Sequence, residues 1–157
     1  GMVRIYDKLY LSRDFDRLDM SEYLRELVTD ISNTAFTGDG RISVVCDLEP
    51  VVVNARCAFP LGIIVSELLS NAFKYAFPDG RSGNVVVIFK RIGEKEVRLT
   101  VSDDGIGAAP DVIRTAGGFG LGLVEALSRQ IGGCAQWNTE GGTMFSITFS
   151  NWQVPCP

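Results

Sequence analysis

Four polar residues interrupt a mostly apolar stretch of the chain, residues 60–77, and their types and spacing suit chemistry on a phosphate. They are Glu67, Ser70, Asn71 and Lys74. Their spacing of i, i+3, i+4 and i+7 would stack all of them on one face of a helix. On that face the Glu67 carboxylate can accept a proton or orient a nucleophile, the Asn71 carbonyl oxygen can bind Mg²⁺, and the Lys74 ammonium can neutralise phosphate. Taken alone, the segment is more typical of a solvated helix face without a binding role, because such stripes are common.

A second candidate is an acidic, glycine-containing segment. The residues DDGIG at 103–107 directly follow LTVS, which is typical of a strand. A carboxylate at a strand end, beside glycines that let backbone approach closely, can accept a hydrogen bond from the exocyclic amine of a base. The segment is not an EF-hand loop, because the acidic spacing and the distal Glu are missing. The alternative interpretation is an ordinary acidic loop.

Two glycine-rich segments lie further along the chain. Residues 117–123 read GGFGLGL and enter a predicted helix, whose free amides and positive dipole end can meet phosphate. This segment is not a P-loop, because no Gly-Lys-Ser/Thr follows, and it lacks the spacing of a dinucleotide-binding turn. Gly141-Gly142-Thr143 lies between two predicted strands. Taken singly, a flexible linker and a hairpin turn would explain these segments.

Hydrophobic periodicity places the polar segments on helices, strands and their connections. Asp19 is a candidate N-cap with Glu22 as its reciprocal partner, and Pro60 is expected near the first turn of the next helix. The predicted helices are 20–34, 60–77 and 121–131, and the predicted strands are 41–48, 51–55, 84–92, 96–103, 134–139 and 143–149. Three helices and several strands in one chain predict an α/β two-layer sandwich, with the helices on one face of a sheet.

The composition fits one globular domain and excludes several kinds of chemistry. The chain has 157 residues, of which 46% are apolar and 22% charged. Histidine is absent, which excludes a Ser-His-Asp triad, a His-ligated metal and a phosphohistidine formed within this chain. A net charge of −4 argues against nucleic acid or anionic lipid as the main partner. The four cysteines form no CxxC pair, and we expect them to be reduced, as in a cytosolic protein.

In this order, the four features resemble the ATP-binding domain shared by histidine kinases, gyrase, MutL and the ninety-kilodalton heat-shock chaperone. The resemblance runs from about Val44 to Phe149. It implies the Bergerat ATP-binding fold, an α+β sandwich in which a mixed, mostly antiparallel sheet of about five strands is covered on one face by three helices. It also implies that the ligands are ATP and Mg²⁺.

The resemblance implies a role for each matching residue of the segment ELLSNAFKYAF, residues 67–77. Glu67 would be the catalytic carboxylate, and Asn71 would be the Mg²⁺ ligand. Lys74 would act with Tyr75 near the phosphates and contribute to catalysis. Whether Glu67 acts as a base or only orients the nucleophile is left open.

The remaining motifs would form the base pocket and the phosphate lid. Asp103 would bind the adenine amino group, and Thr143 would reach the adenine side with Asp103 through water. Glycines would shape the adenine pocket and close over the phosphates: Gly105, Gly107, Gly118, Gly120 and Gly122.

Within the superfamily, the chain is similar to sensor histidine kinases of the HWE-related kind. The similarity rests on KYAFPDG (74–80), a short lid, and the upstream stretch 4–27. It implies the catalytic domain of a two-component kinase that transfers the γ-phosphoryl of ATP to a histidine outside this chain. The implied partners are a helical hairpin bearing that histidine and a response regulator, with no nucleic acid and no membrane contact by this segment. We expect a cytoplasmic domain and a homodimeric parent protein, and leave open whether that parent is attached to a membrane.

Three alternatives remain open. A serine kinase of the anti-sigma type shares the fold and size, but KYAFPDG and residues 4–27 count against it. A non-catalytic nucleotide-binding or phosphotransfer adaptor is disfavoured by intact Glu67, Asn71 and Asp103. A gyrase- or MutL-like ATPase is disfavoured by the acidic net charge.

The motifs suggest how the chain is divided. We expect residues 1–18 to end an upstream helical region or linker, 19–150 to form the histidine-kinase-like ATPase domain, and 151–157 to be a C-terminal tail. Gly1 precedes Met2 and indicates a remnant of tag removal, so we expect an excised piece of a longer protein.

Overall fold

The computed structural model describes residues 17–35, 40–107 and 119–150. In chain order its elements are β1 (Arg17–Asp19), α2 (Met20–Ala35), β2 (Ile42–Leu48), β3 (Val52–Asn54), α3 (Ala55–Asn71), the π-helix η1 (Ala72–Ala76), the 3₁₀-helix η2 (Pro78–Gly80), β4 (Gly83–Arg91), β5 (Glu96–Asp103), α5 (Phe119–Gln130), β6 (Cys134–Asn138) and β7 (Thr143–Ser150).

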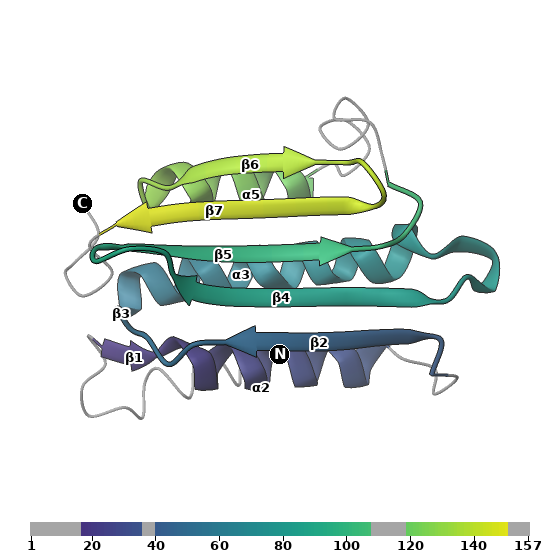
Figure 1. Cartoon of the computed structure of the whole chain (residues 1–157), viewed down its shortest axis with the longest axis horizontal. Coiled ribbons are helices and arrows are strands. Elements are labelled where there is room, and N and C mark those ends of the chain that lie inside the picture. Colours follow the sequence, from purple (N-terminus) through teal and green to yellow (C-terminus); the bar gives the residue numbers. More distant parts are fainter. Residues whose placement is uncertain (1–16, 36–39, 108–118, 151–157) are drawn as a thin grey trace.

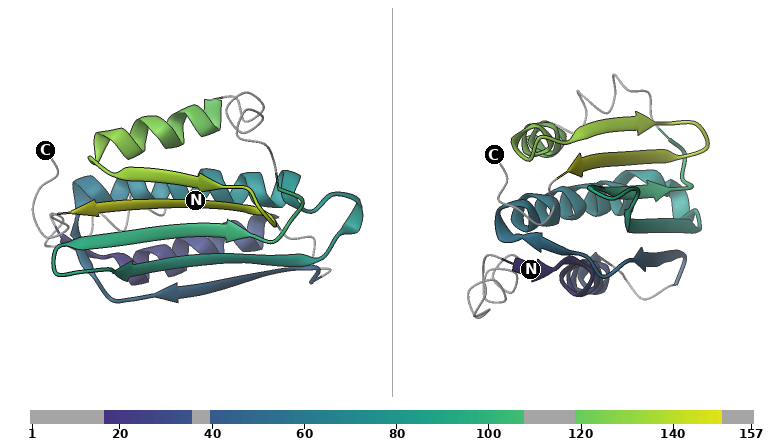
Figure 2. Two further views of the ribbon diagram at one scale, coloured as in Figure 1. Left: turned by 45° about the horizontal axis from the view of Figure 1, so that its top comes forward. Right: turned by 60° about the vertical axis from the view of Figure 1, so that its left-hand side comes forward.

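The sheet has five strands in the order β2-β4-β5-β7-β6. Strand β2 runs parallel to β4, and the other neighbouring pairs are antiparallel. The helices α2, α3 and α5 cover one face of this sheet, with α3 between the other two (Figures 1 and 2). The predicted two-layer fold, with a mixed sheet and three helices on one face, is therefore confirmed.

The core lies between the sheet and the helices. Alternate residues of β4, such as Val87 and Phe89, are fully buried, because successive strand side chains point to opposite faces. They meet the apolar side of α3, including Ile64 and Leu68. By length and composition alone, Ala55–Ala76 resembles a membrane span, but it is the central helix of this core.

The first residues of α2 and α3 are set by side chains that cap the helix N-terminus. Asp19 caps α2 as predicted, because its Oδ1 accepts from the backbone N–H groups of Ser21 at 2.9 Å and Glu22 at 3.4 Å. No reciprocal bond from the Glu22 carboxylate is present among the described residues. Helix α3 begins at Ala55, five residues before the predicted start at Pro60, because Asn54 caps it by accepting from the N–H of Arg56 at 2.8 Å.

The sequence did not predict β1. This strand pairs antiparallel with β3, with Leu18 opposite Val53, and forms a separate two-stranded sheet. A strand of three residues is too short to show the alternating pattern by which strands are recognised. It leads the chain directly into α2.

Among the described residues, the state of the cysteines differs from expectation at Cys57. Cys46 and Cys134 carry free thiols, as expected. Cys57 is disulfide-bonded, so the expectation that it is reduced is wrong. The spacing of cysteines along a chain does not reveal which of them the fold brings within bonding distance.

Helices α2 and α3 approach closely where Tyr23 packs against Gly62. Tyr23 is 2% exposed, and burial raises its pKa. Its hydroxyl has no hydrogen-bond partner in the described part of the chain. A Cβ on Gly62 would overlap the Tyr23 hydroxyl and lie 2.9 Å from its Cε1 atom. The absence of a side chain at position 62 therefore lets the ring fill the space between the two helices.

We predict that Gly62→Ala lowers the free energy of unfolding by about 1–2 kcal/mol, because the overpacking cost exceeds the gain in helix propensity. Chemical denaturation measures the change. The matched control is Gly93→Ala, since a Cβ there meets nothing within 4 Å. Adding Tyr23→Phe should recover part of the loss, and equal stability of the two glycine variants would contradict this account of the contact.

Candidate functional site

Asp103 lies at the end of β5, the central strand of the sheet. It is flanked in register by Val85 of β4 and Thr143 of β7. Its Oδ1 accepts hydrogen bonds from the backbone N–H of Gly105 at 2.9 Å and from that of Thr143 at 3.3 Å. Within the described part of the chain, Oδ2 accepts no hydrogen bond. The half-buried carboxylate thus has one fixed oxygen and a second oxygen available as an acceptor.

The surroundings of Asp103 change its acidity. Burial raises the pKa of its carboxyl, the two backbone hydrogen bonds lower it, and the charge of Asp104 raises it further, with a net increase above the ordinary value. The carboxyl therefore takes up a proton at a higher pH than an exposed aspartate would.

Two glycines let backbone segments pack directly around Asp103. Gly142 has a φ of +129°, and a Cβ there would overlap the main-chain carbonyl of Asp103. Gly107 has a φ of +71°, and a Cβ there would lie 2.9 Å from the carbonyl oxygen of Thr139 and 3.0 Å from that of Gly142. Side chains at these positions would force apart the loop after β5 and the turn between β6 and β7.

The loop after β5 also docks onto the end of η1. The N–H of Ile106 donates to the carbonyl of Ala76 at 3.0 Å, and a Cβ on Gly105 would overlap that carbonyl. Strand β5 and helix α3, which are far apart in sequence, therefore meet at this point. The contact ties Asp103 to the helical segment that carries Glu67 and Asn71.

The face of α3 agrees with the predicted polar stripe only in part. Glu67, Ser70 and Asn71 are half-buried in the last turns of the helix. The amide nitrogen of Asn71 is buried and has no hydrogen-bond partner among the residues that the structure describes. A buried amide without a partner is energetically unfavourable, and a bound group could supply the missing hydrogen bond.

Lys74 departs from the predicted stripe. It lies in the π-helix η1, whose wider turn rotates it away from the position that i+7 spacing gives in an α-helix. Lys74 is exposed, and its neighbour Tyr75 is 61% exposed. The stripe therefore ends at Asn71, and Lys74 reaches into solvent from the following turn.

The glycine-rich segment is described in part. Gly118 lies outside the described residues, whereas Gly120 and Gly122 lie in the first turn of α5, which begins two residues before its predicted start. Gly122 is exposed, and a Cβ there would meet nothing within 4 Å. Packing therefore gives no reason for a glycine at position 122 in a helix, where glycine is unfavourable.

The structure brings Asp103, Gly105, Gly107 and Thr143 together, but it joins Thr143 to the carboxylate through its backbone N–H. The carbonyl of Ala76 and the pairing of Asp104 with Asn84 were not predicted. Asparagine is uncommon inside strands, so Asn84 beside Gly83 at the start of a predicted strand was the available signal.

Few of the described side chains are placed to bind a metal ion. Among the described residues, no group of three or more Asp, Glu, Cys or His could hold a metal ion. The oxygen donors on one face of α3 are the Glu67 carboxylate and the Asn71 carboxamide, one helical turn apart, which suit Mg²⁺. A metal held here would need further oxygen ligands from another molecule or from water.

Comparison with known proteins identifies one family to which the chain is similar. The family model described as histidine kinase-, DNA gyrase B-, and HSP90-like ATPase matches residues 58–153. Blue-light-activated histidine kinase 2 of Erythrobacter litoralis (strain HTCC2594) is 33% identical over 128 residues, which cover 80% of this chain. The chain spans 36% of the length of that relative.

Solved structures agree with the fold. The histidine kinase domain from the Erythrobacter litoralis EL346 blue-light activated histidine kinase superposes with a TM-score of 0.80 at 29% identity, covering 94% of this chain and 76% of that one. The mycobacterial sensor histidine kinase MprB gives a TM-score of 0.69 at 22% identity, covering 85% of this chain and 95% of that one. The second likeness shows the fold alone.

Asp103 and Asp104 lead to opposite effects of pH on stability. The contribution of Asp103 to the free energy of unfolding is lost as the pH rises through its raised folded-state pKa, because ionisation of this half-buried carboxyl disfavours the folded state. The hydrogen bond from the backbone N–H of Asn84 lowers the pKa of Asp104. Asp104 therefore stabilises the fold at a pH above the ordinary pKa of an aspartate, and this stabilisation is lost as the pH falls through the folded-state pKa.

Relative to wild type, Asp103→Asn should gain stability and Asp104→Asn should lose it as the pH rises from about 3.5 to 7. Urea denaturation of the three proteins across this range measures both differences. Parallel trends for the two variants would show that the two carboxylates do not differ as described.

Proposed function

The chain belongs to the histidine kinase-, DNA gyrase B-, and HSP90-like ATPase family, and from this premise we propose that it is the ATP-binding catalytic domain of a sensor histidine kinase. Because the chain contains no histidine, the γ-phosphoryl of ATP would pass to a histidine on another segment or chain. The observation that carries the proposal is the Asp103 carboxylate, with one oxygen fixed by backbone amides and the other available.

The base would be recognised by Asp103. An ionised carboxylate accepts hydrogen bonds and donates none, so Oδ2 matches the exocyclic amine of adenine and rejects a carbonyl in that place. Gly105, Gly107 and Gly142 let backbone segments pack closely around Asp103, and this packing would hold the carboxylate in place for the base. Thr143 holds the carboxylate through its N–H, and its side chain lies beside Asp103 across the strand pair.

The phosphates would lie along the end of α3 and η1. Lys74 is an exposed cation that can neutralise phosphate charge, and Asn71 can direct its carboxamide oxygen to a metal. A Mg²⁺ ion held by Asn71 would supply positive charge that offsets the charge of the phosphates. The first turn of α5, with Gly120 and Gly122, offers backbone N–H groups to the phosphates from the other side.

Transfer would depend on positioning and charge rather than on covalent chemistry by this chain. The half-buried Glu67 carboxylate lies one turn before Asn71 on α3. In that position it can accept a hydrogen bond from the ring of the attacking histidine and orient it. No specific feature of the structure favours a serine kinase or a non-catalytic adaptor.

The partners follow from this chemistry. The domain would act on a helical hairpin that bears the phosphoacceptor histidine, in a parent protein that is a homodimer. A response regulator would take the phosphoryl group from that histidine. The similarity of this chain to a histidine kinase domain supports a cytoplasmic location for this segment.

Asp103→Asn should weaken binding of Mg²⁺-AMPPNP by at least about tenfold, because the amide nitrogen presents donors to the adenine amine where the carboxylate presented an acceptor. Isothermal titration calorimetry measures this. The fold should survive, since the Asn oxygen can still accept from Gly105 and Thr143.

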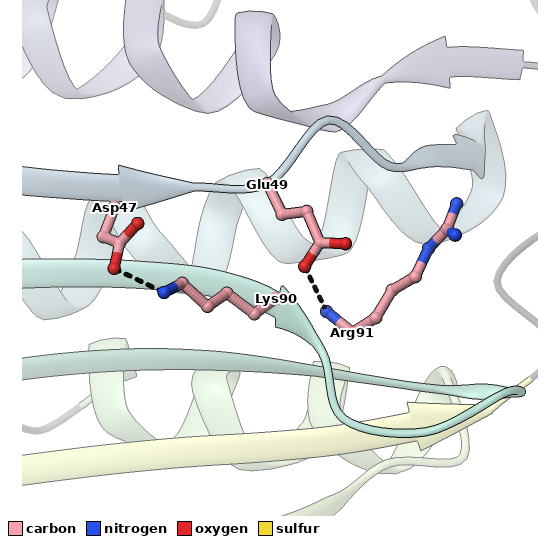
Figure 3. A network of polar contacts seen from close by, with 4 residues as sticks. All are labelled: Asp47, Glu49, Lys90 and Arg91. Carbon is pink, nitrogen blue, oxygen red and sulfur yellow. Dashed lines mark hydrogen bonds and ion pairs between the residues drawn. The ribbon is translucent and has the colours of Figure 1, made fainter.

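Asp47→Asn is the matched control. Asp47 forms an ion pair with Lys90 at 2.6 Å at the opposite end of the sheet (Figure 3). This variant should bind as wild type does. Unchanged affinity in Asp103→Asn would reject the assigned role in adenine binding.

Asn71→Ala should reduce the rate of Mg²⁺-dependent phosphoryl transfer to a supplied histidine-bearing hairpin by about 100-fold or more, with a smaller effect on nucleotide affinity. Asn71→Asp should also be impaired. Transfer is measured with radiolabelled ATP over a range of Mg²⁺ concentrations. A normal rate in both variants would show that Asn71 is not a metal ligand.

A further inference from the structure

Asp104 follows the base-binding residue and is tied to the start of β4 by three hydrogen bonds to a single residue, Asn84. Its Oδ1 accepts from the backbone N–H of Asn84 at 2.7 Å, and its Oδ2 accepts from Asn84 Nδ2 at 3.1 Å. The N–H of Asp104 donates to the carbonyl of Asn84 at 3.2 Å. Side chain and backbone of Asp104 therefore fix one end of the loop after β5.

This pairing determines where the next peptide lies. Gly105 follows directly, and its N–H is one of the two donors that hold Asp103 Oδ1. Gly83 lets Asp104 approach closely, because a Cβ there would lie 2.5 Å from Asp104 Oδ1. A shift of Asp104 away from β4 would move the Gly105 N–H and release the Asp103 carboxylate from one of its two anchors.

We propose that Asp104 and Asn84 form a positioning pair that sets the orientation of the Asp103 carboxylate for recognition of the adenine amine. The inference rests on the proposed function, since it assigns these two residues a part in the same base pocket. Neither residue contacts the nucleotide in this account. Both act through Gly105 and Asp103.

Hydrogen-bond geometry rather than charge would carry the effect. Asp104 is exposed, and its negative charge beside a pocket for an anionic nucleotide opposes binding. An asparagine at position 104 could still accept from the Asn84 N–H, and its amide could donate to the side-chain oxygen of Asn84 after that amide flips. Asp104→Asn therefore keeps the geometry and removes the charge, whereas Asp104→Ala removes both.

The other end of the sheet offers a matched control. Glu49 follows β2, and its Oε2 accepts from the backbone N–H of Arg91, the last residue of β4, at 3.1 Å (Figure 3). Glu49→Ala removes a carboxylate that accepts from a backbone N–H of the same strand, far from Asp103. The Glu49→Ala variant shows how far the loss of a carboxylate that accepts from a β4 backbone N–H changes stability and nucleotide binding when that carboxylate lies far from Asp103.

The test compares ADP with IDP, both with Mg²⁺, by isothermal titration calorimetry on the full chain and its variants. Inosine carries a carbonyl in place of the adenine amine, so the ratio of the two dissociation constants reports recognition by Asp103. The wild type should prefer ADP. Asp104→Ala should weaken ADP binding by about tenfold and leave IDP binding within about twofold, so the ratio falls.

Asp104→Asn should keep the preference for ADP over IDP to within about threefold of that of the wild type, and Glu49→Ala should leave this preference unchanged. Asn84→Ala should weaken ADP binding as Asp104→Ala does. An Asp104→Ala variant that keeps the full ADP preference, or that loses ADP and IDP affinity in equal proportion, would overturn the positioning role while the proposed function stands. Failure of the wild type to bind ADP or ATP would overturn the proposed function, and this inference with it.

Discussion

A half-buried carboxylate at the end of the central strand is the constraint on which the rest of this structure depends. Removing Asp103 from water disfavours its ionised form, and two backbone N–H groups offset part of that cost. Those donors come from different segments, the loop after β5 and the start of β7, so the strand register has to bring both to one oxygen. The remaining oxygen, Oδ2, keeps its capacity to accept a hydrogen bond, and the proposed recognition of a base would use that oxygen.

Close backbone packing makes the arrangement possible. Gly142 lies against the Asp103 carbonyl, and Gly105 lies against the carbonyl of Ala76, so neither position can carry a side chain without moving the loop. The second contact joins the sheet layer to the helix layer at the end of η1, where the α-helix has widened into a π turn. Wide turns of this kind are frequent at functional sites, and here the turn carries the exposed Lys74 and ends at Ala76, onto which the loop docks. The loop after β5 and the end of η1, which we propose to bind the base and the phosphates, are therefore parts of one connected structure.

Much of this could be predicted from the sequence, and the errors have identifiable causes. The strands 84–92 and 96–103 and the cap at Asp19 were predicted closely, because alternation and capping are local signals. The start of α3 was misplaced because Asn54 provides a cap before Pro60. The departure of Lys74 from the polar stripe could not be read from spacing, since a π turn has no reliable sequence signal. The contacts of Asp104 with Asn84 and of Gly105 with Ala76 join segments distant in sequence, and only the folded chain shows them. The roles assigned to all the site residues remain predictions: Glu67, Asn71, Lys74, Tyr75, Asp103, Thr143 and the glycines of the two glycine motifs.

The central claim is that adenine is held by the open oxygen of Asp103 while the phosphates lie along the end of α3. A crystal structure of the chain with AMPPNP and Mg²⁺ tests it most directly. The account predicts that the exocyclic amine of adenine lies within hydrogen-bond distance of Asp103 Oδ2 and that the Asn71 carboxamide faces the metal. A base bound elsewhere, or a pocket filled by side chains of the protein, would contradict it.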